Sequence, residues 1–206
     1  KGSSITQEAI VKFATDLLMR TDDFDVPKEI ENLIIDELIE VNEDNVKYFF
    51  KQSPSLRSFI AKIYAASIIN LPIIIYGPTG VGKTEAARVF GRSRNNQCFR
   101  FSFQSGTKSK HIYGTATISN GNAVFIKGLL TTAIQKGGTF IADDFHLATI
   151  STMKSLAPVL EPCIGEKVFL IESGMSITID PNFFLIACQE ELKTKVQQQD
   201  AKDDEI

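Results

Sequence analysis

The segment IYGPTGVGKT, residues 75–84, decides the fold of this chain. It has the spacing G-x-x-x-x-G-K-T, with Gly77, Gly82, Lys83 and Thr84 at the defining positions. Glycines let backbone N–H groups approach phosphate oxygens closely, and a following helix adds positive potential at its N-terminus. A lysine at this spacing reaches the outer phosphates, and the threonine hydroxyl can take a Mg²⁺ position. The segment therefore predicts a phosphate-binding loop.

The residues around the loop supply the structural context that this spacing requires. The apolar, β-branched run LPIIIY, residues 71–76, predicts a buried strand of a parallel sheet before the loop. A helix is predicted from Lys83 to about Arg92. The predicted nucleotide-binding residues are Gly77, Pro78, Thr79, Gly80, Val81, Gly82, Lys83 and Thr84.

A second motif, TFIADDFHLA, follows at residues 139–148. Asp143 ends an apolar run, and an acid at the carboxyl end of a strand beside a phosphate loop is placed to hold Mg²⁺, usually through water. The next acid, Asp144, can polarise an attacking water. The alternative is an aspartate pair that caps the next helix. With the phosphate loop upstream, the sequence favours a metal site made by Thr84 and Asp143.

The remaining chain divides into a helical part and an alternating part. Helical periodicity predicts helices over 5–20, 27–41, from near Asn45, and from Ser53–Pro54 to about Ile69. Further strands are predicted at 98–103, 138–143 and 182–188, and helices at 129–136 and 149–160. Strands alternating with helices predict an open α/β sheet of three layers. Two β-hairpins are predicted, turning at Asn120-Gly121 and at Ser173-Gly174.

These segments predict three parts of the chain. Residues 1–65 form an N-terminal helical extension, residues 66–195 form the nucleotide-binding core, and residues 196–206 form a polar tail. The chain begins with Lys1 rather than methionine, so we expect a piece of a longer protein.

Composition limits the classes of partner. A hydrophobic content of 43% over 206 residues suffices for one sizeable domain with a core. The net charge of -3 shows no basic excess, which argues against nucleic acid as the main partner. No apolar run reaches the ~20 residues of a spanning helix, so no membrane partner is expected.

Two residue types indicate the compartment and the surface. Three scattered cysteines and two histidines show no metal-binding spacing, which favours reduced thiols in the cytoplasm or nucleus. Cys98 and Cys188 lie in apolar runs and are expected in the core. The arginines at 88, 92 and 94 form a local cluster that favours a solvated helix end over nucleic-acid contact.

Residues 70–191 resemble the AAA+ ATPases, and among them the midasin and dynein-related branch. FIADDFHLA at 140–148 is similar to that branch's Walker B segment, LAPVLEP at 156–162 to the end of its following helix, and DPNFFLIACQE at 180–190 to the run that leads to sensor 1. The two predicted hairpins lie where this branch has its helix-2 insert and its pre-sensor hairpin. The resemblance implies the AAA+ large subdomain, with a sheet ordered 5-1-4-3-2, and ATP with Mg²⁺ as ligands. It also implies neighbouring AAA+ modules as partners, in the same polypeptide or in a homo-oligomer.

The chain departs from that branch at the catalytic positions. Asp144 stands where a glutamate is usual, one methylene shorter, and a displacement of ~1 Å can cost ~100-fold in rate. Glu190 aligns with the sensor 1 asparagine, unless Gln189 substitutes for it. The predicted catalytic set is thus Asp144, Gln189 and Glu190. No arginine follows Arg100, so neither the family's arginine finger nor its sensor 2 arginine is expected in this chain. The family's fifth strand and C-terminal helical lid are not recognisable in the sequence either.

Three functions follow as hypotheses. The first is an ATPase module that hydrolyses Mg-ATP slowly within a larger ring or multi-module mechanoenzyme. The second is a hydrolysis-deficient, nucleotide-binding structural or regulatory module. The third is a scaffold with a vestigial site, which the intact loop argues against. A GTPase is disfavoured because the chain has no [NT]-K-x-D segment, and the protein cargo stays unknown.

Overall fold

The computed structural model describes residues 4–17, 26–41, 54–94, 97–160, 165 and 167–190. Its α-helices are α1 (Ser4–Leu17), α2 (Lys28–Val41), α4 (Pro54–Ile68), α5 (Lys83–Ser93), α6 (Ser109–Tyr113), α7 (Leu129–Lys136) and α8 (Ile150–Leu160), with a short 3₁₀ helix η1 (Phe145–Leu147). Its strands are β1 (Ile73–Gly77), β2 (Cys98–Ser102), β3 (Gly114–Ser119), β4 (Asn122–Lys127), β5 (Thr139–Asp143), β6 (Lys167–Leu170), β7 (Met175–Thr178) and β8 (Phe184–Glu190).

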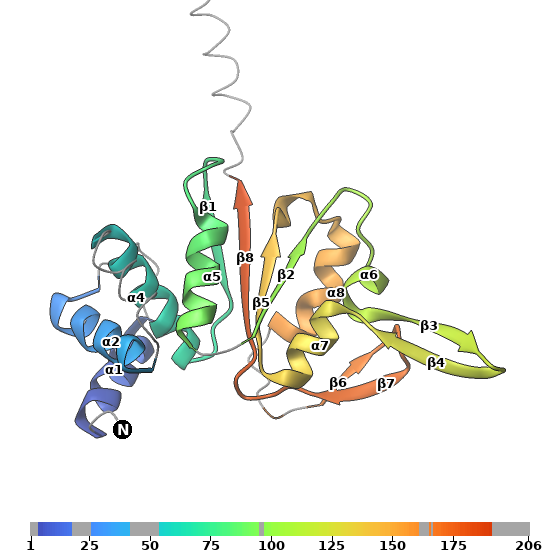
Figure 1. Ribbon diagram of the computed structural model, residues 1–206, viewed down its shortest axis with the longest axis horizontal. Coiled ribbons are helices and arrows are strands. Elements are labelled where there is room, and N and C mark those ends of the chain that lie inside the picture. The colour runs from blue at the N-terminus through green and yellow to red at the C-terminus, as the bar shows by residue number, and fades with distance from the viewer. Residues whose placement is uncertain are drawn as a thin grey trace, which may run out of the picture.

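The central sheet is parallel and ordered β1-β8-β5-β2 (Figure 1). This is the 1-4-3-2 part of the order that the resemblance implies, with β5 and β8 as its third and fourth strands. The described residues include neither the fifth strand of that order nor a helical lid, and the sequence has no recognisable signal for either. A helix predicted from near Asn45 also lies outside them.

The two inner strands are buried on both faces, as their continuous apolar sequences predict. Successive residues of β8 alternate between two apolar clusters: Leu185 and Ala187 join one, and Phe184 and Ile186 join the other. The first cluster is covered by α6, α7, α8 and the β6–β7 hairpin, and the second by α5 and the N-terminal helices. The three-layer α/β architecture expected from the sequence is therefore confirmed.

The N-terminal helices share a core with the sheet. Ile10 of α1, Ile34 of α2 and Ile60 of α4 are fully buried in the same cluster as Phe90 of α5 and Ile186 of β8. In Figure 1 these helices lie beside α5, at the end of the molecule opposite the β3–β4 hairpin. Helix α4 also crosses the boundary predicted at residues 65–66.

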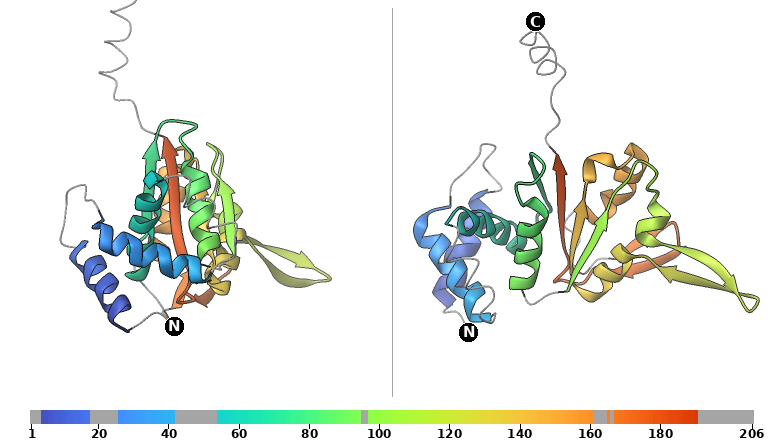
Figure 2. Two further views of the ribbon diagram at one scale, coloured as in Figure 1. Left: turned by 60° about the vertical axis from the view of Figure 1, so that its left-hand side comes forward. Right: turned by 45° about the horizontal axis from the view of Figure 1, so that its top comes forward.

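Both predicted hairpins are present. Asn120 and Gly121 have φ of 51° and 77°, the left-handed conformation that a two-residue hairpin turn demands. The β3–β4 ribbon projects away from the body of the molecule (Figure 2). The β6–β7 hairpin turns over four residues, and the Gly174 N–H donates to the Leu170 carbonyl at 2.9 Å.

Three details differ from the sequence-based expectations. Cys98 is exposed, because it lies on the edge strand β2, whereas Cys188 is buried as predicted. Arg94 is not solvated as predicted for the arginine cluster. Its guanidinium lies 5.8 Å from the ring centroids of Phe90 and Phe184, and burial lowers its pKa. Helix α6 was not predicted, since five residues are too few to show a period.

None of the described helices is long and apolar enough to span a bilayer.

Candidate functional site

The candidate site lies at the carboxyl edge of the central sheet, where open α/β sheets bind ligands. The register sets Gly77 beside Glu190 and Ser102 beside Asp143, so all four strands end together. Residues far apart in the sequence therefore meet around the loop between β1 and α5.

The loop has the backbone that a phosphate cradle needs. Gly80 and Gly82 have φ of 82° and 87°, which side-chain-bearing residues rarely adopt, and Gly82 directly precedes α5. The Lys83 ammonium donates to the carbonyls of Gly77 at 2.8 Å and of Pro78 at 2.7 Å. Lys83 is thus folded onto its own loop, next to the helix N-terminus.

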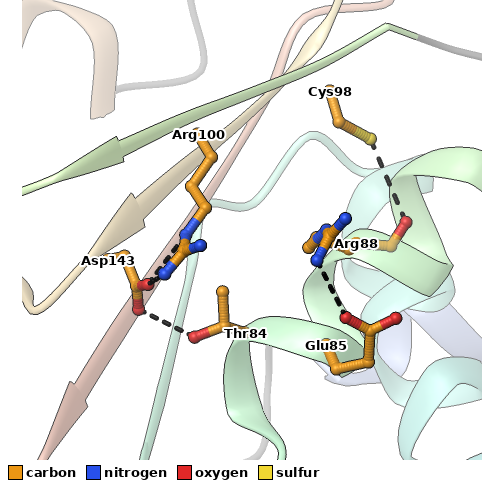
Figure 3. Close-up of polar contacts among 6 residues, drawn as sticks. All are labelled: Thr84, Glu85, Arg88, Cys98, Arg100 and Asp143. Atoms are coloured by element: carbon orange, nitrogen blue, oxygen red, sulfur yellow. Dashed lines mark hydrogen bonds and ion pairs between the residues drawn. The ribbon is translucent and has the colours of Figure 1, made fainter.

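Asp143 and Thr84, the two residues predicted to hold the metal, contact each other. The Thr84 hydroxyl donates to Asp143 Oδ1 at 2.8 Å, and the Asp143 side chain is only 8% exposed. The five residues of β5 are all buried, which holds this carboxylate rigidly. Arg100 of β2 occupies the other oxygen: its Nε donates to Asp143 Oδ2 at 2.9 Å, and a terminal nitrogen makes a second bond (Figure 3).

Asp144 is held apart from Asp143. Its φ of 53° is left-handed, a conformation that aspartate tolerates better than most residues, and it begins the 3₁₀ helix η1. Its carboxylate accepts a hydrogen bond from Ser102 at 2.9 Å. The turn therefore directs two consecutive acids to different partners.

Glu190 contacts the loop directly. The Thr79 hydroxyl donates to Glu190 Oε1, and the Glu190 backbone N–H donates to His146 Nδ1 at 3.4 Å. An anion thus lies at the phosphate side of the site, while the neighbouring Gln189 also lines the pocket.

One pocket of about 330 Å³ brings most of the predicted residues together. From the predicted set it is lined by Thr79, Gly80, Gly82, Lys83, Thr84, Asp143, Asp144, Gln189 and Glu190. Val81 instead lines a second, more apolar cavity of about 490 Å³ between α4 and the start of α5, with Leu56, Phe59 and Tyr76. Gly77 and Pro78 take part through their carbonyls, which hold Lys83.

The oxygens at the first pocket suit Mg²⁺, which prefers carboxylate and hydroxyl ligands and keeps most of its other ligands from water and phosphate. The described residues contain no cluster of three or more His, Cys, Asp or Glu that could hold a metal alone. Thr84 and Asp143 would therefore hold Mg²⁺ together with a bound phosphate.

Cys188 adds a buried thiol to the pocket lining. Cys188 is 1% exposed, and burial, followed by the charge of Asp143, raises the pKa of its thiol to about 12, although Lys83, Arg100 and a hydrogen bond from Thr84 oppose the shift. The buried thiol therefore adds no charge to the site at neutral pH.

Sequence reasoning missed Arg100 and Ser102. Both lie on β2, where alternation puts Cys98, Arg100 and Ser102 on one face of the strand. The sequence did contain a signal for them. The predicted strand at 98–103 has polar residues at every second position near its carboxyl end, which indicates one polar face at the edge of the sheet where Asp143 lies.

Comparisons with known proteins agree with this geometry. A sequence profile of the AAA domain (dynein-related subfamily) matches residues 72–202, which is more than half of the chain. Midasin of Dictyostelium discoideum is 33% identical over 127 residues, covering 59% of this chain and 2% of midasin. NorQ of Paracoccus denitrificans is 25% identical over 130 residues, covering 62% of this chain and 47% of NorQ.

A solved structure described as a candidate ATPase from Cytophaga hutchinsonii has the same fold, with a TM-score of 0.51 at 16% identity over 92% of this chain and 48% of that one. The chain thus spans less than half the length of these relatives. From the matched residues and the sheet order, the chain belongs to the dynein-related subfamily of AAA domains, a family of nucleotide-binding ATPases.

Proposed function

We propose that this chain binds Mg-ATP between the 77–84 loop and the carboxyl end of β5, and hydrolyses it slowly. The observation that carries the proposal is the contact of Thr84 with Asp143, at 2.8 Å across 59 positions, beside a lysine on a glycine-rich loop. A glycine-rich turn that arose by chance would not be expected to bring the residue after its lysine into contact with an aspartate from a fully buried strand.

The residues have distinct roles in this proposal. Lys83 leaves the carbonyls of Gly77 and Pro78 to meet the outer phosphates. Thr84 and Asp143 hold Mg²⁺, which neutralises phosphate charge when bound. Asp144 accepts the proton of the attacking water, while Gln189 and Glu190 face the outer phosphate from β8.

The apolar cavity beside the loop fits the base of the nucleotide. It adjoins the phosphate pocket through Gly82, Lys83 and Glu85, which line both. Its Leu56 and Phe59 come from α4, so the N-terminal helices supply part of the nucleotide site. Stacking and apolar contact with a flat base suit such a lining.

The partners we propose are neighbouring AAA+ modules in a larger assembly. Among the described arginines, only Arg100 lines the phosphate pocket, and no arginine follows it in the chain. A neighbour that supplies an arginine would raise the rate, since such a residue is worth about 10³–10⁵ in P-loop enzymes. The cytoplasm or nucleus is the compartment that the reduced cysteines favour.

Calorimetric titration of ATP with Mg²⁺ tests binding, with Lys83→Ala as the variant and Lys136→Ala, in the last turn of α7, as the matched control. We expect micromolar binding by the protein and by Lys136→Ala, and at least a 100-fold loss in Lys83→Ala, because a charge-assisted phosphate contact disappears. Equal binding by all three proteins would refute the proposed site.

A second function, nucleotide binding without turnover, is favoured by two contacts. Ser102 holds the Asp144 carboxylate, and Glu190 places an anion against Thr79 of the loop. Turnover of the protein, Asp144→Glu and Asp144→Asn separates the two functions. Slow hydrolysis predicts that Asp144→Asn loses about 100-fold and Asp144→Glu gains rate. A rate at background in all three would favour the structural module.

A further inference from the structure

We propose that Arg100 is a built-in counter-ion for the metal site: it neutralises Asp143 while Mg²⁺ is absent, and it exchanges to the phosphates when the metal binds. This inference rests on the proposed nucleotide site. It assigns a role to a residue outside the phosphate loop and outside the acidic motif of β5.

Several polar groups of the pocket are paired with its own residues or with the loop backbone. Lys83 donates to carbonyls of its own loop, Ser102 donates to Asp144, and Thr79 donates to Glu190. The metal-binding aspartate has the strongest partner: Arg100 places two of its N–H donors on Asp143 Oδ2, while Thr84 takes Oδ1. Figure 3 shows Arg100 and Thr84 approaching this carboxylate together.

The pairing has an electrostatic reason. Asp143 is nearly buried, and a buried carboxylate without a partner is costly. The pocket also contains Asp144, Glu85 and Glu190, and within the described part of the chain only Glu85 of these four acids has a salt bridge to a cation outside the pocket, Arg88 at 3.2 Å. Besides Lys83, Arg100 is the cation within the pocket that offsets the other three, and it comes from the edge strand.

Metal binding and this ion pair compete for the charge of one carboxylate. Oδ1 accepts from Thr84 and Oδ2 accepts two Arg100 donors, so a cation that binds Asp143 competes with the Arg100 guanidinium for the same negative charge. The two Arg100 bonds to Oδ2 are charge-assisted and geometrically fixed, which makes them a substantial cost to metal entry. Arg100 thus lowers the affinity of the site for a metal that arrives without phosphate.

The released guanidinium is drawn toward bound phosphates rather than into the neighbouring cavity. Arg100 lines both the phosphate pocket and an adjacent cavity of about 440 Å³ whose other lining residues are Arg88, Arg92 and Cys98. Moving into that cavity would bring three guanidinium groups together, which is electrostatically unfavourable. The phosphates on the opposite side attract the same group, so Arg100 turns toward them.

Half of the Arg100 side chain is exposed, which leaves it free to turn. Its side-chain exposure is 51%, against 8% for Asp143. A long, partly solvated side chain can change rotamer without disturbing the core, whereas the buried strand β5 keeps Asp143 in place. The exchange therefore moves the arginine and leaves the metal ligand fixed.

The first measurement is Mn²⁺ binding to the nucleotide-free protein, followed by water-proton relaxation, with Mn²⁺ as the probe for Mg²⁺. Arg100→Ala is expected to bind Mn²⁺ about tenfold more tightly than the protein, because the competing charge-assisted bonds are gone. Arg92→Ala is the matched control: it removes the same charge from the same cavity, contacts no described acid, and should change affinity less than twofold.

A further variant separates the contact from the charge. Arg100→Lys keeps the cation but loses the two-bond fork, so its Mn²⁺ affinity should fall between the other two. If Arg100→Ala binds Mn²⁺ no more tightly than Arg92→Ala, the counter-ion role is overturned. Because Arg100 is half exposed, all variants should fold, and thermal unfolding checks this.

The second measurement is ATP binding at saturating Mg²⁺. With the metal on Asp143, the released Arg100 joins Lys83 as a cation that faces the phosphates, so Arg100→Ala should bind ATP about fivefold more weakly than Arg92→Ala. The exchange predicts that Arg100→Ala raises the affinity for Mn²⁺ and lowers the affinity for ATP. An unchanged ATP affinity would contradict the movement of Arg100 toward the phosphates. If Lys83→Ala alone leaves ATP binding intact, the nucleotide site fails instead, and the Mn²⁺ result still stands.

Discussion

Glu190 is the residue at which charge most directly opposes nucleotide binding. It lies beside Gly77 in the sheet and accepts a hydrogen bond from Thr79 of the phosphate loop. A bound phosphate would therefore face a carboxylate at a position where the related family has an amide.

Glu190→Gln is expected to bind Mg-ATP about fivefold more tightly, because it removes one negative charge near the phosphates. The glutamine carbonyl can still accept from Thr79, so the loop contact survives. Titration calorimetry at low and high salt measures the effect, which should shrink as salt rises. Glu172→Gln, in the β6–β7 loop, carries the same charge change outside the pocket and should leave the affinity unchanged.

Because of the buried Cys188 thiol, we expect the protein to become less stable at alkaline pH. Burial, and then Asp143, raise the pKa of this thiol from 9.0 to about 12. Its folded form keeps the proton while its unfolded form loses it above pH 9, so the free energy of unfolding falls as pH rises from 9 to 12, by up to about 1.4 kcal/mol per pH unit.

Chemical denaturation from pH 8 to 11, beside Cys188→Ala, isolates this contribution from other ionisations. The stability advantage of the protein over Cys188→Ala should shrink above pH 9. A constant difference across that range would show that the thiol does not titrate with unfolding.

At the scale of elements, two glycines let the β3–β4 ribbon emerge between α6 and α7. A Cβ on Gly128 would lie 2.2 Å from the Ile112 carbonyl oxygen, and one on Gly114 would lie 2.2 Å from the Ile126 carbonyl oxygen. The Gly128 N–H donates to the Tyr113 carbonyl at 2.8 Å. Backbone meets backbone here, so neither neighbour can move aside.

Gly128→Ala should therefore destabilise the protein by about 3 kcal/mol, at the upper end of overpacking costs. Gly106→Ala is the control, because its added Cβ meets nothing within 4 Å, and it should stay within about 0.5 kcal/mol. Urea denaturation followed by circular dichroism compares them. Equal stability of the two variants would mean that the ribbon base is looser than its geometry indicates.

At the scale of the whole molecule, the N-terminal helices and the sheet should unfold together. Ile60 of α4 is fully buried in the cluster that contains Phe90, Phe184 and Ile186. Ile60→Ala should cost about 3 kcal/mol, the usual cost of a large truncation in a core. Ile74→Ala removes the same atoms at a 55% exposed site and should cost much less.

Hydrogen exchange tests whether Ile60→Ala destabilises the N-terminal helices and the sheet together. Because one apolar cluster joins them, α1, α2, α4 and β8 should all lose protection in Ile60→Ala. Loss of protection confined to the three helices would mean that they form a separate cooperative unit, as a division at residues 65–66 implies.

Local patterns determined much of this protein. The glycine spacing of 77–84 and the apolar runs before Gly77 and Asp143 carry their own conformational signals, as does the Asn120-Gly121 turn. Helix α7 matches its predicted bounds, and β1, β2, β5 and β8 match within two residues. Periodicity and turn chemistry act over a few residues, so they can be read without the fold.

Tertiary structure decided which polar side chains meet. Arg100 and Asp143 are separated by 43 positions, Ser102 and Asp144 by 42, and Thr79 and Glu190 by 111. Strand order and register set these pairs, and the same register left Cys98 exposed on an edge strand that its apolar neighbours suggested was buried. Side-chain pairing across a parallel sheet depends on which strands are neighbours, a long-range outcome of packing both faces of the sheet, and no short stretch of sequence specifies it.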